Sequence, residues 1–304
     1  MLSTVTAALT EALVEMFLYG VYAVLLTAVI YLVRSRRGSL LEKKSARWVL
    51  FGLIIQFLVI TGHCINTICE TFLAIVRLGG GAAAEAFYLD LSTTSSVVHI
   101  TLLVMCTLVT DILVIHRLYV ICSYTRNIVL FPLAILVAQA AGGVGSIYHF
   151  ARWYSDKLGS TKYLLLDGWV VTHLVSSIVI SAYCSGMIYW KIRGINRAVG
   201  RLSGHIGGGM KLTSVLAILV ESAAIQTATT IGALVTFQVG FIGVIAWSGI
   251  SPAVLGISTV LIHARIGLGW AHEPDYHIGS NPTRINFAGN DALQGAEHEL
   301  ENRK

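Results

Sequence analysis

Two carboxylates lie deep inside long apolar runs, where an ionisable side chain is costly and often functional. Asp111 lies in the run 97–121, within the stretch TLVTDILVIHRLYVI, and Glu221 lies in the run 212–237. At 1.5 Å per residue, each carboxylate is roughly 14–15 Å from the basic end of its helix, so the two could share one cavity. They could serve as a proton-linked switch, a ligand contact or a general acid, or could only lock helices together by hydrogen bonds.

Other polar residues recur at helical spacing inside apolar runs. The run 169–190 has one at every fourth position: His173, Ser177, Ser181 and Ser185. The run 212–237 has a similar stripe: Ser222, Gln226, Thr229 and Thr230. Residues spaced in this way share one helix face, which should point inward, either to line a pocket or to let helices pack closely. The candidates for a ligand pocket are His99, Asp111, His173, Ser177, Glu221 and Gln226.

Metal and cofactor signals are weak. The histidines in the outer halves of the apolar runs, His63, His99 and His173, could bind zinc, but the sequence has no H-x-x-x-H pair. The last apolar run has no lysine for a retinal Schiff base, and no D-D-x-x-D motif is present to hold magnesium and diphosphate. We therefore expect no cofactor. Glu15 and Glu70 are expected near the outer interface, where solvation of a charge is cheap.

The composition predicts an integral membrane protein. Hydrophobic residues make up 55% of the chain, charged residues 12%, and the mean hydropathy is +0.74. Runs of about 20 apolar residues are long enough to cross a bilayer as helices. Seven such runs occur: 12–33, 48–71, 97–121, 128–150, 169–190, 212–237 and 240–263. The predicted fold is an all-α, seven-transmembrane helix bundle, and the segments GGGAAAE (79–85) and SGHIGGG (203–209) are expected to be flexible loops.

Orientation follows from the distribution of Lys and Arg, which are retained on the cytoplasmic side. Seventeen of the 21 lie at the helix ends and loops after the first, third and fifth runs, or in the tail. The sequence therefore predicts residues 1–11 outside, a transmembrane domain over 12–271 and a disordered cytoplasmic tail over 272–304. Contact with anionic lipid explains the net charge of +5, so we expect a bilayer partner and no nucleic acid.

Four segments resemble fungal seven-span membrane proteins that are described as receptor-like. They are ALVEMFLYGVYAVLLTAVIYLVRSRR (12–37), DILVIHRLYVI (111–121), ILVESAAIQT (218–227) and GISPAVLGISTVLIHARIGLG (249–269). The chain departs from that family at Cys122 and Ser123, where the family pattern has Trp. It also departs from animal G-protein-coupled receptors, because His116 replaces the acidic residue before the basal arginine.

The resemblance implies a G-protein-coupled-receptor-like sensor of a small ligand, with a cytoplasmic signalling partner. Its coupling candidates are His116, Arg117 and Tyr119, although Arg117 is expected mainly at the cytoplasmic rim against lipid phosphate. The plasma membrane is the expected location, with an internal membrane as the alternative, because topology is the same along the secretory route.

Two other functions remain open. A membrane enzyme, for example one similar to the fungal seven-span terpene cyclases, would use Asp111 and Glu221 to protonate an apolar substrate. A transporter is the other alternative. We expect a sensor rather than an enzyme.

Overall fold

The computed structural model describes residues 4–35, 40–90, 93–122, 125–152, 168–202, 224–238 and 241–271. Within these ranges the regular structure is entirely helical, which confirms the predicted all-α class. The chain divides into two units, Met1–Gly269 and Trp270–Lys304, and the first contains every side-chain contact discussed below. Its labelled elements are α1 (Thr4–Ser35), α2 (Leu40–Phe72), the π-helix η1 (Leu73–Arg77), α3 (Gly81–Leu89), α4 (Thr94–Ile121), α5 (Arg126–Arg152), α7 (Gly168–Leu202) and α9 (Phe241–Ala271). Residues 224–238 are also helical.

Five of the described helices are long and apolar enough to cross a bilayer, as an integral membrane protein requires. These candidate spans are Thr4–Leu32, Arg47–Arg77, Thr94–Ile121, Arg126–Arg152 and Gly168–Gly194. The first five predicted runs fall within the corresponding helices α1, α2, α4, α5 and α7. The sixth run is described only from residue 224, and the seventh coincides with α9, which contains a shorter apolar stretch, Trp247–Ile262.

The segment GGGAAAE is not the flexible loop that the sequence predicts. Gly79, Gly80 and Gly81 all have positive φ angles, which glycine adopts without a steric penalty, and they turn the chain back after α2. The alanines that follow have the highest helix propensity and form the first part of α3. The other predicted loop, 203–209, and the tail 272–304 lie outside the described residues.

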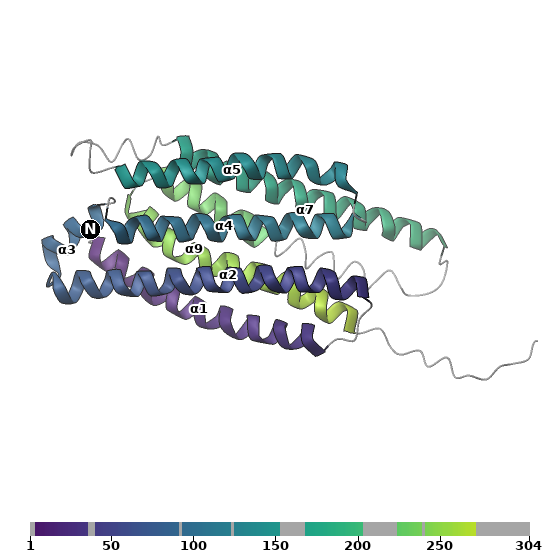
Figure 1. The fold of residues 1–304 in the computed structure, drawn as a ribbon, viewed down its shortest axis with the longest axis horizontal. Coiled ribbons are helices and arrows are strands. Elements are labelled where there is room, and N and C mark those ends of the chain that lie inside the picture. The colour runs from purple at the N-terminus through teal and green to yellow at the C-terminus, as the bar shows by residue number, and fades with distance from the viewer. Residues whose placement is uncertain are drawn as a thin grey trace, which may run out of the picture. The chain divides into compact units, whose positions relative to one another are not determined.

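Helix α4 lies at the centre of the bundle, in contact with α2, α5 and α7 (Figure 1). In its most apolar 18-residue stretch, 50% of the residues are buried, more than in the other four candidate spans. Helices α1, α4 and α7 begin, and α2 and α5 end, at one end of the bundle, which we call the α3 end. Towards the opposite, far end, the helices pack through apolar side chains such as Leu118, Ile180 and Ile262.

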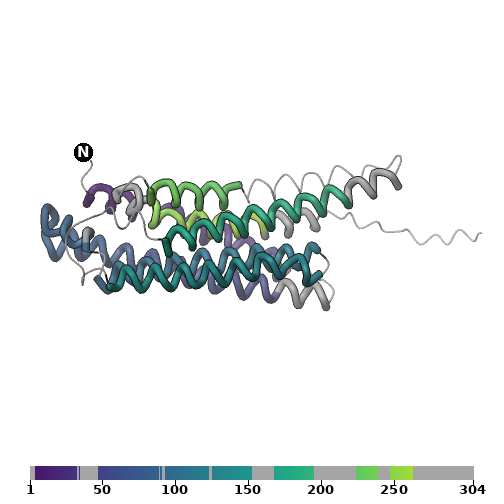
Figure 2. Tube along the Cα trace, turned by 90° about the horizontal axis from the view of Figure 1, so that it is seen from above, coloured from purple at the N-terminus to yellow at the C-terminus, as the bar shows by residue number. Residues whose placement is uncertain are grey.

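Residues 224–238 run alongside α9, as the view in Figure 2 shows. The indole Nε1 of Trp247 in α9 donates a hydrogen bond to the carbonyl oxygen of Thr229, at 3.0 Å. A Cβ atom at Gly232 would overlap the Trp247 ring, so this glycine leaves room for the indole. The Trp247 side chain therefore joins α9 to residues 224–238, because Gly232 leaves space for its ring and the Thr229 carbonyl accepts its hydrogen bond.

Helices α5 and α7 approach each other closely at Gly142. A Cβ atom there would lie 2.9 Å from the backbone nitrogen of His173 and 3.0 Å from the carbonyl oxygen of Trp169. We expect Gly142→Ala to lower the free energy of unfolding by about 1–3 kcal/mol, because backbone cannot move aside as a side chain can. The measurement is unfolding of the detergent-solubilised protein, monitored by circular dichroism during titration with sodium dodecyl sulfate.

The matched control is Gly186→Ala in α7, where an added Cβ would meet no atom within 4 Å. Alanine is the better helix former, so this variant should be neutral or more stable by up to about 1 kcal/mol. Equal stability changes in the two variants would contradict close α5–α7 packing at Gly142.

Candidate functional site

A cavity of about 180 Å³ lies among the helices at the α3 end of the bundle. Its lining includes residues of α1, α2, α3, α4, α5, α7, 224–238 and α9. Most of the wall is apolar, with Leu103, Phe150 and Phe237 among its members. A mostly apolar cavity with a few polar groups is the usual form of a small-molecule site.

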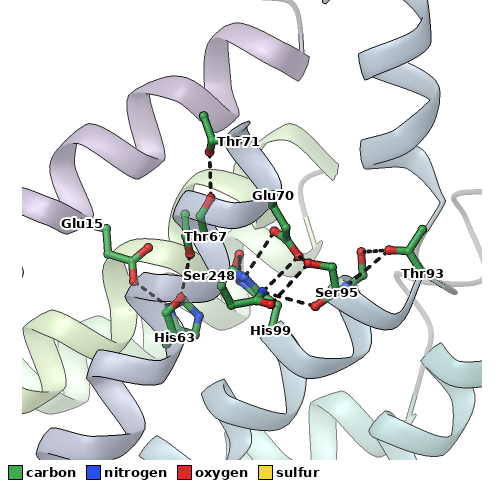
Figure 3. Close-up of polar contacts among 11 residues, drawn as sticks. Glu15, His63, Thr67, Glu70, Thr71, Thr93, Ser95, His99 and Ser248 are labelled. Atoms are coloured by element: carbon green, nitrogen blue, oxygen red, sulfur yellow. Dashed lines mark hydrogen bonds and ion pairs between the residues drawn. The ribbon is translucent and has the colours of Figure 1, made fainter. Parts of the chain in front are cut away.

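Glu70 of α2 forms the centre of one polar group on the cavity wall. Its Oε1 accepts hydrogen bonds from Ser95 Oγ at 2.7 Å and Asn66 Nδ2 at 3.1 Å. Its Oε2 lies 3.8 Å from His99 Nδ1, and His99 Nε2 lies 3.3 Å from Ser248 Oγ. These contacts join α2, α4 and α9 beside the cavity (Figure 3).

A second polar group lies next to it, where Glu15 of α1 meets His63 of α2. His63 Nδ1 and Glu15 Oε1 are 2.7 Å apart, and both side chains are at most 1% exposed. The rings of His63 and His99 are 4.2 Å apart between centroids, so the two groups are in contact. Figure 3 shows Glu15 and Glu70 on opposite sides of this histidine pair.

Glu11 and Tyr88 add two more polar side chains to the cavity wall. Glu11 lies one helical turn before Glu15 and is buried against Ser248 and Gly249 of α9. Tyr88 belongs to α3, outside the candidate spans, and hydrogen-bonds with Thr71. Burial raises the pKa of Tyr88 above its usual value, so its phenol stays neutral at physiological pH.

His173 and Thr107 close the cavity on the side facing the middle of the bundle. Thr107 Oγ1 and His173 Nε2 are 2.8 Å apart, and His173 Nδ1 lies 3.1 Å from the carbonyl oxygen of Gln139. Thr107 Oγ1 also donates a hydrogen bond to the carbonyl oxygen of Val104 at 2.9 Å, so its hydroxyl has two polar neighbours. The cavity wall is thus hydrogen-bonded to the backbone of α5.

Beyond this wall, Asp111 connects four helical segments. Its Oδ2 accepts from Ser177 Oγ of α7 at 2.6 Å and from Gln139 Nε2 of α5 at 2.7 Å. Its Oδ1 accepts from Gln226 Nε2, within 224–238, at 3.1 Å. Asp111 is fully buried and is not a lining residue of the cavity. We call Asp111, Gln139, Ser177 and Gln226 the Asp111 cluster.

The candidates predicted from the sequence divide between these sites. Asp111, Ser177 and Gln226 meet in the Asp111 cluster, whereas His99 and His173 line the cavity. Along α7, His173, Ser177 and Ser181 are buried, as their spacing predicts, whereas Ser185 is only partly buried. Glu221 lies outside the described residues, and so does its predicted pairing with Asp111.

The three histidines of the alternative metal site do not come together. His63 and His99 are adjacent, but His173 is bonded to Thr107 and Gln139. In the described part of the chain, no group of three or more His, Cys, Asp or Glu side chains could hold a metal ion.

Two expectations about charged residues are wrong. Glu15 and Glu70 are not cheaply solvated at an interface, because Glu15 is 1% exposed and the Glu70 side chain 12% exposed. Arg117 does not face lipid phosphate; it is 7% exposed, and its Nη2 donates to the carbonyl oxygen of Thr259 in α9 at 3.2 Å. The other coupling candidates, His116 and Tyr119, are partly buried on the same turns of α4.

Glu11 is a site residue that was not predicted from the sequence. The sequence does contain a signal for it, since Glu11 and Glu15 are four residues apart and therefore share one helix face at the start of an apolar run.

Comparison with protein-family models, curated proteins and solved structures finds no match to the chain, so the resemblance to fungal seven-span proteins remains a prediction from sequence.

Proposed function

We propose that the protein is a receptor-like, seven-span membrane sensor whose cavity binds a small ligand. In this proposal the N-terminus is outside, as the distribution of Lys and Arg predicts, and the protein lies in the plasma membrane. The α3 end is then the outer end, and the cavity opens to ligands on that side. The basic far end faces a cytoplasmic signalling partner.

The cavity is the single observation that carries the proposal. Its lining residues come from α1 to α5, α7, 224–238 and α9, so a ligand in it would contact several helices at the same time. Binding energy can therefore depend on how these helices are packed, which is the condition for a ligand to shift a conformational equilibrium. Ligand binding in a cavity between only two helices would depend less on how the whole bundle is packed.

A chain of hydrogen bonds links the cavity to the Asp111 cluster. His173 lines the cavity and contacts the Gln139 carbonyl, and the Gln139 side chain donates to Asp111. A ligand that displaces His173 would therefore disturb a cluster that holds α4, α5, α7 and 224–238 together. Six residues beyond Asp111, Arg117 binds the backbone of α9 and offers a contact that such a rearrangement could break.

The position of Asp111 favours the sensor over a terpene cyclase-like enzyme. A general acid must lie within hydrogen-bonding distance of its substrate, directly or through one water. Asp111 instead accepts three hydrogen bonds from protein groups and does not line the cavity. In this arrangement it is suited to holding helices together rather than to protonating a substrate in the cavity.

The proposal predicts saturable binding of a small apolar probe, which filling the cavity should abolish. We expect 2-phenylethanol to bind the protein in lipid nanodiscs, measured by isothermal titration calorimetry. Ala233 lines the cavity, so Ala233→Trp should weaken binding at least about tenfold, equivalent to 1.4 kcal/mol. Ala138→Trp, on the exposed face of α5, is the matched control and should bind as the wild type does.

Sensing can be tested in the same preparation. Nitroxide labels on Arg126→Cys and Arg193→Cys, two exposed positions at the far end, report the separation of α5 and α7 by pulsed electron resonance. Exposed Cys69 is replaced by Ser in this variant. The probe should shift the distance distribution. Saturable binding with no shift would contradict the sensor, and absence of saturable binding would contradict the ligand site itself.

A further inference from the structure

The acidic groups beside the cavity outnumber the basic ones. Three carboxyl groups, Glu11, Glu15 and Glu70, lie within electrostatic reach of one another, and two imidazoles, His63 and His99, lie among them. The described lining residues include no Lys or Arg. Because there are three carboxyl groups and two imidazoles, at least one carboxyl group has no imidazole partner.

Glu11 is the carboxyl group without an imidazole partner; its polar neighbours are the Ser248 side chain and the Gly249 backbone of α9. Glu15 has His63 as its partner, and Glu70 has Ser95, Asn66 and His99. Glu11 lines the cavity and is only 5% exposed, yet its Oε1 has no hydrogen-bond donor within the described structure. Leaving a buried carboxylate oxygen unsatisfied costs more than leaving a neutral one, so this atom is suited to a donor supplied by a ligand.

The rest of the wall suits an organic cation. The aromatic rings of Tyr88, Phe150, Phe237 and Trp247 line the cavity, and aromatic faces attract ammonium groups. At about 180 Å³, the cavity is somewhat larger than the ~150 Å³ cavities that accommodate benzene. This volume admits one ring with a short side chain.

We propose that the ligand is a protonated amine on a small apolar body, and that Glu11 binds its ammonium group through the unpartnered Oε1. The inference rests on the proposed function of the cavity and adds the chemical class of its ligand. A metal ion is the less suitable occupant, because the described His, Cys, Asp and Glu residues form no cluster of three or more potential ligands. Glu11 therefore selects for charge, and the rings select for shape.

The test compares two probes of nearly equal size and shape, 2-phenylethylamine and 2-phenylethanol, with phenylacetate as the anion. Calorimetric titration of the nanodisc-embedded protein should show the amine binding at least about tenfold tighter than the alcohol, as expected for a charge-assisted hydrogen bond. Phenylacetate should bind more weakly than either. Glu11→Gln should remove the preference for the amine and change the affinity for the alcohol less than about twofold.

Two further variants isolate the effect of Glu11. Glu85→Gln removes an exposed carboxylate of α3 that does not line the cavity, and the amine preference should persist in it. Gly249→Ala keeps the carboxylate but moves it, because the added Cβ would overlap the Glu11 side chain. This variant should also lose the preference, and it serves as the test if Glu11→Gln does not fold.

The outcomes separate this inference from the proposed function. Equal affinities for the amine and the alcohol in the wild type would overturn the inference and leave the ligand site standing. An amine preference that survives both Glu11→Gln and Gly249→Ala would overturn the role of Glu11. If none of the three probes binds saturably, the ligand site and the inference both fail.

Discussion

Replacing Asp111 with alanine should lower the free energy of unfolding by about 2–5 kcal/mol, because three interhelical hydrogen bonds are lost together. Each such bond contributes on average about 0.6 kcal/mol in a membrane protein and at most about 1.7 kcal/mol. The substitution would also leave the donors of Gln139, Ser177 and Gln226 without their acceptor in a fully buried place. The expected loss is therefore larger than that of most single substitutions.

Asp111→Asn should lower the free energy of unfolding by only about 1 kcal/mol. The difference in stability between the Asn and Ala variants tests the geometry of the cluster. The new amide offers one acceptor and two donors, so one donor would face the donor of Gln139. Gln139 Oε1 has no hydrogen-bond partner in the described structure, and rotation of the Gln139 amide would turn this oxygen towards the new donor. A Gln139→Leu background removes this rescue, and Asp111→Asn should then still cost less than Asp111→Ala, because the new amide oxygen can accept from Ser177 or Gln226.

The measurement is unfolding in mixed detergent micelles, with Ile112→Ala as the control on the exposed side of the same turn. Ile112 is 49% exposed, so its truncation should cost less than about 1 kcal/mol. If Asp111→Ala and Ile112→Ala lose equal stability, Asp111 does not hold the helices together.

The long apolar helices could be predicted because each satisfies its own backbone. A helix in lipid pairs every N–H and C=O within one segment, so length and hydropathy of that segment are enough to find it. The five long described helices illustrate this. Helix α3 could not be found in this way, because three glycines that favour a turn directly precede the alanines that favour a helix. The prediction of a loop gave weight to the glycines only.

Contacts between helices could not be predicted in the same way. Depth alone suggested Glu221 as the partner of Asp111, whereas the described partners of Asp111 come from α5, α7 and 224–238. Which side chains meet depends on how each helix is rotated about its axis, and many rotations suit the same apolar composition. Gln139 is neutral and isolated in its run, so nothing marked it as a partner before the packing was known.

The burial of the charged residues at the cavity wall could not be predicted from the sequence either. Glu15 and Glu70 lie near the ends of their apolar runs, where a linear count places them at an interface. In the folded chain α3 and the start of α4 lie at the same end, and the polar contacts there are internal (Figure 3). Burial of a residue near a helix end depends on what packs over it, which is a property of the assembled bundle.

The Glu15–His63 pair should show the largest stability effect at the α3 end. Both side chains are almost fully buried, and their polar atoms are 2.7 Å apart. Removing one partner of a buried pair typically costs about 3–5 kcal/mol, because the other is left buried without its hydrogen-bond partner. We expect losses of this size for Glu15→Leu and for His63→Leu. The exposed His149 of α5 provides a matched control, and His149→Leu should change stability by less than about 0.5 kcal/mol.

The double variant Glu15→Leu/His63→Leu should recover a large part of either loss, since apolar side chains can replace a buried polar pair at little net cost. Unfolding of the four proteins in the cycle yields the coupling energy, expected to exceed about 2 kcal/mol. Raising the salt concentration to about 1 M should leave the coupling nearly unchanged, because a buried pair is poorly screened. Additive losses in the double variant would show that the two residues stabilise the bundle separately and that their contact contributes nothing.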